Sequence, residues 1–172
     1  MVAKILVTGH FSAGKTQFIA TLTKNCFSTE VKVSSDEEKI KSSTTVAMDY
    51  GKISISGIDI HLFGTPGQER FDFMLEILGR NHDGAVILID STDKSNILKT
   101  ERFIQFLRKE GKPFIVACNK QDMKDSLTSE EIAGLMNLPR DIVLPLTALE
   151  YSSCFSVIDR LVNHIVSNRK AA

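Results

Sequence analysis

The chain has 172 residues, and its 21 lysines and arginines balance 21 aspartates and glutamates, so the formal net charge is zero. That balance excludes the basic surface of a nucleic-acid-binding protein, and no run approaches the roughly 20 apolar residues of a membrane span. The three scattered cysteines are typical of a reducing cytoplasm, and neither end carries a residue for the usual lipid anchors. We therefore expect one cytoplasmic domain over residues 1–172, without a nucleic acid partner or a direct lipid anchor.

The first half of the chain predicts a strand, a helix, a long loop and a hairpin. Lys4–Thr8 is an apolar run of strand type, and Lys15 to about Asn25 has the composition of a helix. Phe27–Ser43 is polar and shows no clear period, which predicts a long surface loop. Val46–Ser56 and Ile58–Phe63 alternate apolar and polar residues around Gly57, so we expect them to pair as a hairpin.

The second half continues the alternation of strands and helices. Continuous apolar runs predict buried strands at Ala85–Ile89 and Phe114–Cys118, and a third strand is expected at Asp141–Leu146. Apolar residues at helical spacing predict helices at Asn96–Lys109 and Phe155–Val166. This order of elements is typical of an α/β fold.

One motif joins the first strand to the first helix. Residues 9–16 read Gly-His-Phe-Ser-Ala-Gly-Lys-Thr, which is the pattern G-x-x-x-x-G-K-[ST]. Glycines at positions 9 and 14 allow the main chain to curl around phosphates, whose oxygens then accept hydrogen bonds from backbone N–H groups. Lys15 adds a charge for the β and γ phosphates, and the Thr16 hydroxyl is a ligand for Mg²⁺. The motif predicts a nucleoside triphosphate site.

A second motif, Asn119-Lys120-Gln121-Asp122, follows a buried strand and favours guanine. The carboxylate of Asp122 accepts two hydrogen bonds from the N1–H and exocyclic amine of guanine, whereas adenine offers no such pair of donors. Asn119 is expected to hold the loop near the purine, and the stem of Lys120 to cover a face of the ring.

With these motifs the chain resembles the Ras-like small GTPases, above all prokaryotic MglA-like and Rab- and Arf-like members. Besides the two motifs above, the resemblance rests on Thr44–Asp49, Gly64–Phe71 and Thr147–Leu149, which follow in the order of the family. It implies a P-loop three-layer sandwich whose six-stranded mixed sheet has five parallel strands and one antiparallel edge, with helices on both faces. It also implies a P-loop at 9–16, switch I at about 27–46 and switch II at about 64–80.

The resemblance assigns roles residue by residue. Thr45 matches the switch I threonine that binds Mg²⁺ beside Thr16, with Thr44 as its rival, and Gln68 matches the glutamine that orients the attacking water. Gln68 and Lys15 are the expected catalytic residues. The full set expected at the nucleotide is Gly9, Ser12, Ala13, Gly14, Lys15, Thr16, Gln17, Thr45, Gly67, Asn119, Lys120, Asp122, Thr147, Ala148 and Leu149.

Three departures from the family pattern qualify these expectations. Gly64 stands where most members have the aspartate that supports Mg²⁺ through water, with Asp90 as one candidate to replace it. Pro66 stiffens the turn before Gly67. No arginine lies between residues 25 and 45 to act as a catalytic arginine within the chain.

The leading functional prediction is a signalling switch that hydrolyses GTP slowly to GDP and phosphate. The resemblance implies Mg²⁺ as cofactor, and as partners activating and exchange proteins, roadblock-type proteins among them, together with effectors. The alternative is an interaction module that binds GTP or GDP with negligible hydrolysis. A P-loop kinase would need a lid with catalytic arginines, for which the sequence gives no sign.

Overall fold

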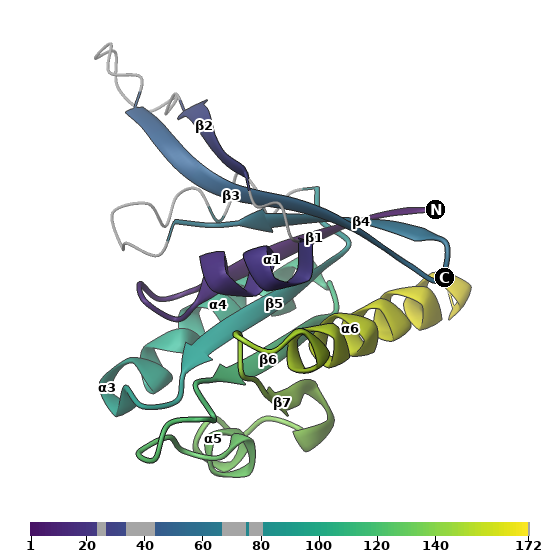
Figure 1. The fold of residues 1–172 in the computed structure, drawn as a ribbon. Coiled ribbons are helices and arrows are strands. Elements are labelled where there is room, and N and C mark those ends of the chain that lie inside the picture. The colour runs from purple at the N-terminus through teal and green to yellow at the C-terminus, as the bar shows by residue number, and fades with distance from the viewer. Residues whose placement is uncertain (24–26, 34–43, 67–74, 76–80, 172) are drawn as a thin grey trace.

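The computed structural model describes residues 1–23, 27–33, 44–66, 75 and 81–171. Its centre is a mixed sheet with the strand order β2-β3-β4-β1-β5-β6-β7 (Figure 1). The strands are β1 (Val2–Gly9), β2 (Phe27–Val33), β3 (Thr44–Ile55), β4 (Ile58–Gly64), β5 (Gly84–Asp90), β6 (Phe114–Asn119) and β7 (Val143–Pro145). β1 and β4 to β7 are parallel, whereas β3 runs antiparallel to β4.

The six expected strands are therefore present, with five parallel and one antiparallel, and β2 adds a seventh. β2 pairs antiparallel with the outer side of β3, so the interpretation of Phe27–Ser43 as a loop throughout is wrong for its first seven residues. Phe27, Thr29, Val31 and Val33 are strand-forming residues at every second position, but the Ser, Glu and Lys between them hide this pattern. In Figure 1 the β2–β3 ribbon extends beyond the rest of the sheet.

The predicted hairpin of β3 and β4 is confirmed. Its strands are joined by Ser56 and Gly57, which have φ values of 50° and 78°. Positive φ at both positions is the geometry of the two-residue turn whose twist matches that of the flanking strands. The turn fixes the register, which places Asp49 directly opposite Gly64.

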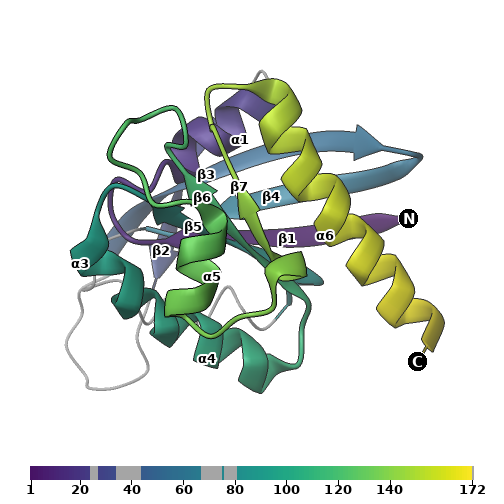
Figure 2. The ribbon, with the colours of Figure 1, turned by 90° about the horizontal axis from the view of Figure 1, so that it is seen from below.

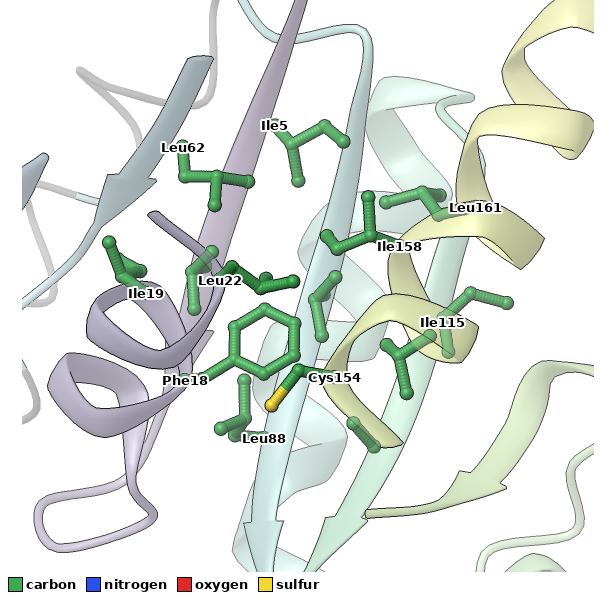
Figure 3. Packing of buried hydrophobic residues seen from close by; sticks show 14 of the residues in the cluster. Ile5, Phe18, Ile19, Leu22, Leu62, Leu88, Ile115, Cys154, Ile158 and Leu161 are labelled. Carbon is green, nitrogen blue, oxygen red and sulfur yellow. The ribbon is translucent and has the colours of Figure 1, made fainter. Parts of the chain in front are cut away.

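Helices cover both faces of the sheet, as expected (Figure 2). On one face, α1 (Lys15–Thr23) and α6 (Tyr151–Ala171) pack through side chains such as Phe18 and Ile158 on Ile5 of β1 (Figure 3). On the other face, α4 (Glu101–Glu110) and α5 (Ser129–Leu135) pack on a cluster that includes Leu6. Successive residues of β1 thus serve opposite cores, which explains its continuous apolar run.

Three helical details differ from the sequence-based expectation. The predicted helix Asn96–Lys109 is divided into α3 (Lys94–Ile97), a 3₁₀ turn at Leu98–Thr100, and α4, which is capped by Gly111 with φ 63°. Helix α5 was not predicted, although a capping box of Thr128 and Glu131 marks its start. Helix α6 begins earlier and ends later than Phe155–Val166.

Across the described ranges, no helix combines the length and apolar character needed to cross a membrane.

Candidate nucleotide-binding site

The loop between β1 and α1 has the backbone that its glycines predict. Gly9 has φ +142°, and a Cβ there would lie 2.3 Å from the carbonyl oxygen of Leu88 on β5. Gly14 has φ +98°. Ser12, between them, also has a positive φ of 63°. These values curl the main chain at the carboxyl end of β1, the edge of a parallel sheet where ligands bind.

Lys15 begins α1 and folds back over this loop. Its Nζ donates to the carbonyl oxygens of Gly9 at 2.9 Å and His10 at 2.6 Å. Only 8% of the residue is exposed. Burial lowers the pKa of Lys15 to about 8, opposed by the attraction of Asp49. The ammonium group thus lies desolvated in the loop, where an anionic ligand would relieve the unfavourable burial of its charge.

A cavity of about 560 Å³ opens beside Lys15. It is lined by the P-loop residues Phe11, Ser12, Gly14, Lys15, Thr16 and Gln17, and by Asp49, Gly64, Thr65 and Pro66 from the strands. On its wall Thr16 Oγ1 donates to Asp49 Oδ2 at 2.5 Å. Asp49 is one of the lining residues that the sequence-based set does not contain. The signal that would have found it is its place opposite Gly64 in the hairpin.

Asn119, at the end of β6, connects the P-loop with the loop before α6. Its Nδ2 donates to the carbonyl oxygen of Ala13 at 2.9 Å, and its Oδ1 accepts from the N–H of Ala148 at 2.9 Å. The residue is 4% exposed. Because both ends of one buried amide are occupied, the two loops are held at a fixed distance from each other.

A second cavity of about 330 Å³ lies next to the first. It is lined by Gly14, Gln17, Asn119, Lys120, Asp122, Met123, Ala148 and Leu149. Gly14 and Gln17 line both cavities, so the two hollows adjoin each other over the start of α1. Asp122 is exposed, and Leu149 is 69% exposed. Thr147 is bound to the start of α6, because its backbone N–H donates to Ser153 Oγ at 2.9 Å.

Asp90 contacts Lys120, a residue that lines this second cavity. One carboxylate oxygen accepts from Lys120 Nζ at 2.5 Å, and the other accepts from the N–H and hydroxyl of Thr92. Burial opposes ionisation of Asp90, but these hydrogen bonds outweigh it and hold its pKa below the ordinary value. Asp90 does not line the cavity that contains Thr16 and Gly64, so its observed contacts do not support it as the replacement for the carboxylate missing at Gly64.

Several expected residues lie outside what the structure describes. Gly67 and Gln68 are outside the described residues. The backbone of Thr45 is placed in β3 opposite Lys32, and its side chain is outside the description. The roles assigned to these three residues remain predictions.

The donors on the wall of the larger cavity fit Mg²⁺. Thr16 and Asp49 present hydroxyl and carboxylate oxygens, the hard ligands that Mg²⁺ prefers. Among the described residues, no group of three or more His, Cys, Asp and Glu side chains is arranged so that it could hold a metal ion. Mg²⁺ is usually bound through one or two protein oxygens together with phosphate and water, so this sparse donor set suits a metal that arrives with a nucleotide.

Comparison with known proteins gives concordant results. The family model of the elongation factor Tu GTP-binding domain matches residues 1–165. An uncharacterized protein of Methanocaldococcus jannaschii is 31% identical, with 96% of each chain covered. Human ADP-ribosylation factor-like protein 4C is 29% identical over 97% of this chain and 88% of its own length. The G domain of the T. maritima FeoB iron transporter has a similar fold, with a TM-score of 0.68, 18% identity and coverage of 95% and 98%.

Proposed function

Because the chain belongs to the family of the elongation factor Tu GTP-binding domain, within the Ras-like small GTPase superfamily, we propose that it is a signalling switch driven by GTP. The chain is a GTP-binding G domain of the small GTPase type. In the proposed cycle it binds GTP, hydrolyses it slowly to GDP and phosphate, and presents different surfaces in the two states. The scattered cysteines support a cytoplasmic setting.

The observation that carries this proposal is a pair of hydrogen bonds at Asn119, which donates to the carbonyl oxygen of Ala13 and accepts from the N–H of Ala148. They hold the cavity with Lys15 and the smaller cavity with Asp122 next to each other, in the order that a nucleotide needs from phosphate to base. We assign the phosphates to Gly9, Ser12, Ala13, Gly14, Lys15, Thr16 and Gln17, and the base to Asn119, Lys120, Asp122, Thr147, Ala148 and Leu149.

In the base site Asp122 provides the selectivity. Its exposed carboxylate accepts from both donors on the guanine edge, and adenine would leave it without partners. Lys120 has φ 67° and its ammonium is held by Asp90, which fixes the stem of the side chain along the cavity wall. This placement supports its role as a cover for the ring.

In the phosphate site, bound Mg²⁺ would neutralise charge on the β and γ phosphates. We assign Thr16 and Thr45 to the metal, and Gly67 to the γ-phosphate. Lys15 contributes its charge to the same phosphates, and Gln68 orients the attacking water. The lack of an arginine between residues 25 and 45 supports slow hydrolysis by the isolated chain. An arginine supplied by a partner is worth about 10³–10⁵ in rate.

The proposed partners are therefore proteins that activate hydrolysis, proteins that exchange the nucleotide, and effectors. Roadblock-type proteins are included by resemblance to the MglA-like members.

GTP turnover by the purified chain tests the proposed activity. The expected rate is on the order of 10⁻⁴–10⁻² per second, rising when cell extract is added. Gln68→Ala should lower the intrinsic rate at least tenfold without weakening GTP binding. Gln105→Ala, which changes an exposed glutamine on α4, should leave the rate unchanged. Bound GTP that stays intact in wild type, with and without extract, would instead favour an interaction module without hydrolysis.

A further inference from the structure

Asp49 and Gly64 share one small space at the edge of the phosphate cavity. They lie directly opposite each other in the β3–β4 ladder, and opposite residues of an antiparallel pair project to the same face. A Cβ on Gly64 would lie 3.1 Å from the Cβ of Asp49 and 3.1 Å from Cδ1 of Ile19. A carboxylate therefore fits readily at one of the two positions, and this chain has it at residue 49.

The Asp49 carboxylate reaches the P-loop from β3. Its Oδ2 accepts a hydrogen bond from Thr16 Oγ1 at 2.5 Å. Its negative charge raises the pKa of Lys15, which burial lowers. Asp49 is also the one acidic side chain among the described residues that line this cavity. The position thus combines a negative charge, contact with the expected metal ligand and access to the phosphate site.

We propose that Asp49 supplies the Mg²⁺-supporting carboxylate that the family pattern places at residue 64. This inference rests on the proposed function. A hydroxyl has one hydrogen and two acceptor lone pairs. Asp49 takes the hydrogen of Thr16, which leaves the lone pairs of that oxygen for the metal, and adds a negative charge beside it. Asp49 is then a positioning residue, of the kind whose loss typically costs about 10–100-fold in metal affinity.

The test measures the release of a fluorescent GDP analogue as Mg²⁺ is titrated against EDTA. In Asp49→Asn, the Mg²⁺ concentration that halves the release rate should rise roughly 10–100-fold. Release in EDTA without Mg²⁺ should match wild type, because Asp49 is assigned to the metal and not to the nucleotide. Asp59→Asn, a like change at a carboxylate on β4 that pairs with Lys52, is the matched control and should behave as wild type.

A second variant moves the carboxylate back across the ladder. The double substitution Asp49→Gly with Gly64→Asp removes the contact that crowds residue 64, and should restore a Mg²⁺ dependence within about threefold of wild type. An unchanged Mg²⁺ dependence in folded Asp49→Asn overturns the inference. If Asp49→Asn does not fold, the double variant is compared with Asp49→Gly alone. A double variant that binds the analogue but needs as much Mg²⁺ as Asp49→Gly then overturns the inference. Wild type that does not bind the analogue overturns the proposed function itself.

Discussion

Gly14 lies so close to Asn119 that a Cβ at residue 14 would come within 2.3 Å of the Asn119 side-chain nitrogen. That nitrogen donates to Ala13, the residue before Gly14. The close approach of the P-loop to the end of β6 therefore depends on the absence of a side chain at residue 14. The same contact joins the region assigned to the phosphates with the region assigned to the base.

Gly14→Ala should disrupt the contact that joins these two regions. The added methyl group meets a buried amide and must adopt φ +98°, so we expect lower thermal stability and at least tenfold weaker GDP binding. Gly134→Ala is the control, because residue 134 is an exposed position of α5 where an added Cβ would meet no atom within 4 Å. It should stabilise the protein by about 0.5–1 kcal/mol. Equal behaviour of the two variants would contradict the packing argument.

Lys15→Met should abolish the stabilisation by GTP without lowering the stability of the protein itself. Burial lowers the pKa of Lys15 from 10.5 to about 8, which corresponds to about 3 kcal/mol of unfavourable interaction for the charged form. Removing the buried charge should stabilise the folded protein, and the loss of the hydrogen bonds to Gly9 and His10 offsets part of that gain. We expect the variant without nucleotide to unfold at the same temperature as wild type or higher, but to lose the stabilisation that GTP gives.

Thermal unfolding with and without GTP measures both effects. Lys109→Met, at an exposed position of α4, should keep the full GTP effect. An empty Lys15→Met protein that is less stable than wild type would mean that Lys15 holds the fold together.

Cys118 and Cys154 should resist thiol reagents. Both are fully buried, and burial raises the pKa of each thiol to about 12. At pH 8 the reactive thiolate fraction is then about 10⁻⁴. In a Cys26→Ser variant, which removes the third cysteine, Ellman's reagent should label no thiol of the native protein within minutes and two after denaturation. Rapid labelling of the native variant would show that one of these side chains is accessible.

Much of the fold follows from local sequence patterns. The glycines and the lysine of residues 9–16 identify the first loop, and the turn at Gly57 identifies the hairpin. Strand β2 was not predicted, because its polar residues are typical of a surface loop and its pairing depends on β3. Helix α5 was missed despite the spacing of Thr128 and Glu131, since it is only seven residues long.

The site was predictable in part. Asp49 and Gly64 are equally distant from the turn at Ser56 and Gly57, so their pairing follows from the hairpin register alone. The contact of Asp49 with Thr16 does not, because it depends on how α1 packs against the sheet. The same is true of the contact between Lys120 and Asp90, whose residues are 30 positions apart.

Asp122→Asn should change the base preference. The substitution replaces one acceptor oxygen by a donating amide, which no longer matches guanine but does match the carbonyl group of xanthine. We expect weaker GDP binding and stronger binding of xanthosine diphosphate, measured by displacement of a fluorescent nucleotide. Asp125→Asn, three residues along the same exposed segment, should keep the preference for GDP. If both variants still prefer GDP, the base is read by another group.

Competition between GTP and ATP for the wild-type protein with Mg²⁺ present measures whether the chain selects guanine nucleotides, as the proposed switch requires. A site whose carboxylate must be paired typically rejects the mismatched ligand by about 10⁴–10⁵. We therefore expect GTP to displace a bound fluorescent GDP analogue at concentrations several orders of magnitude below those needed for ATP. Equal displacement by the two nucleotides would contradict this expectation.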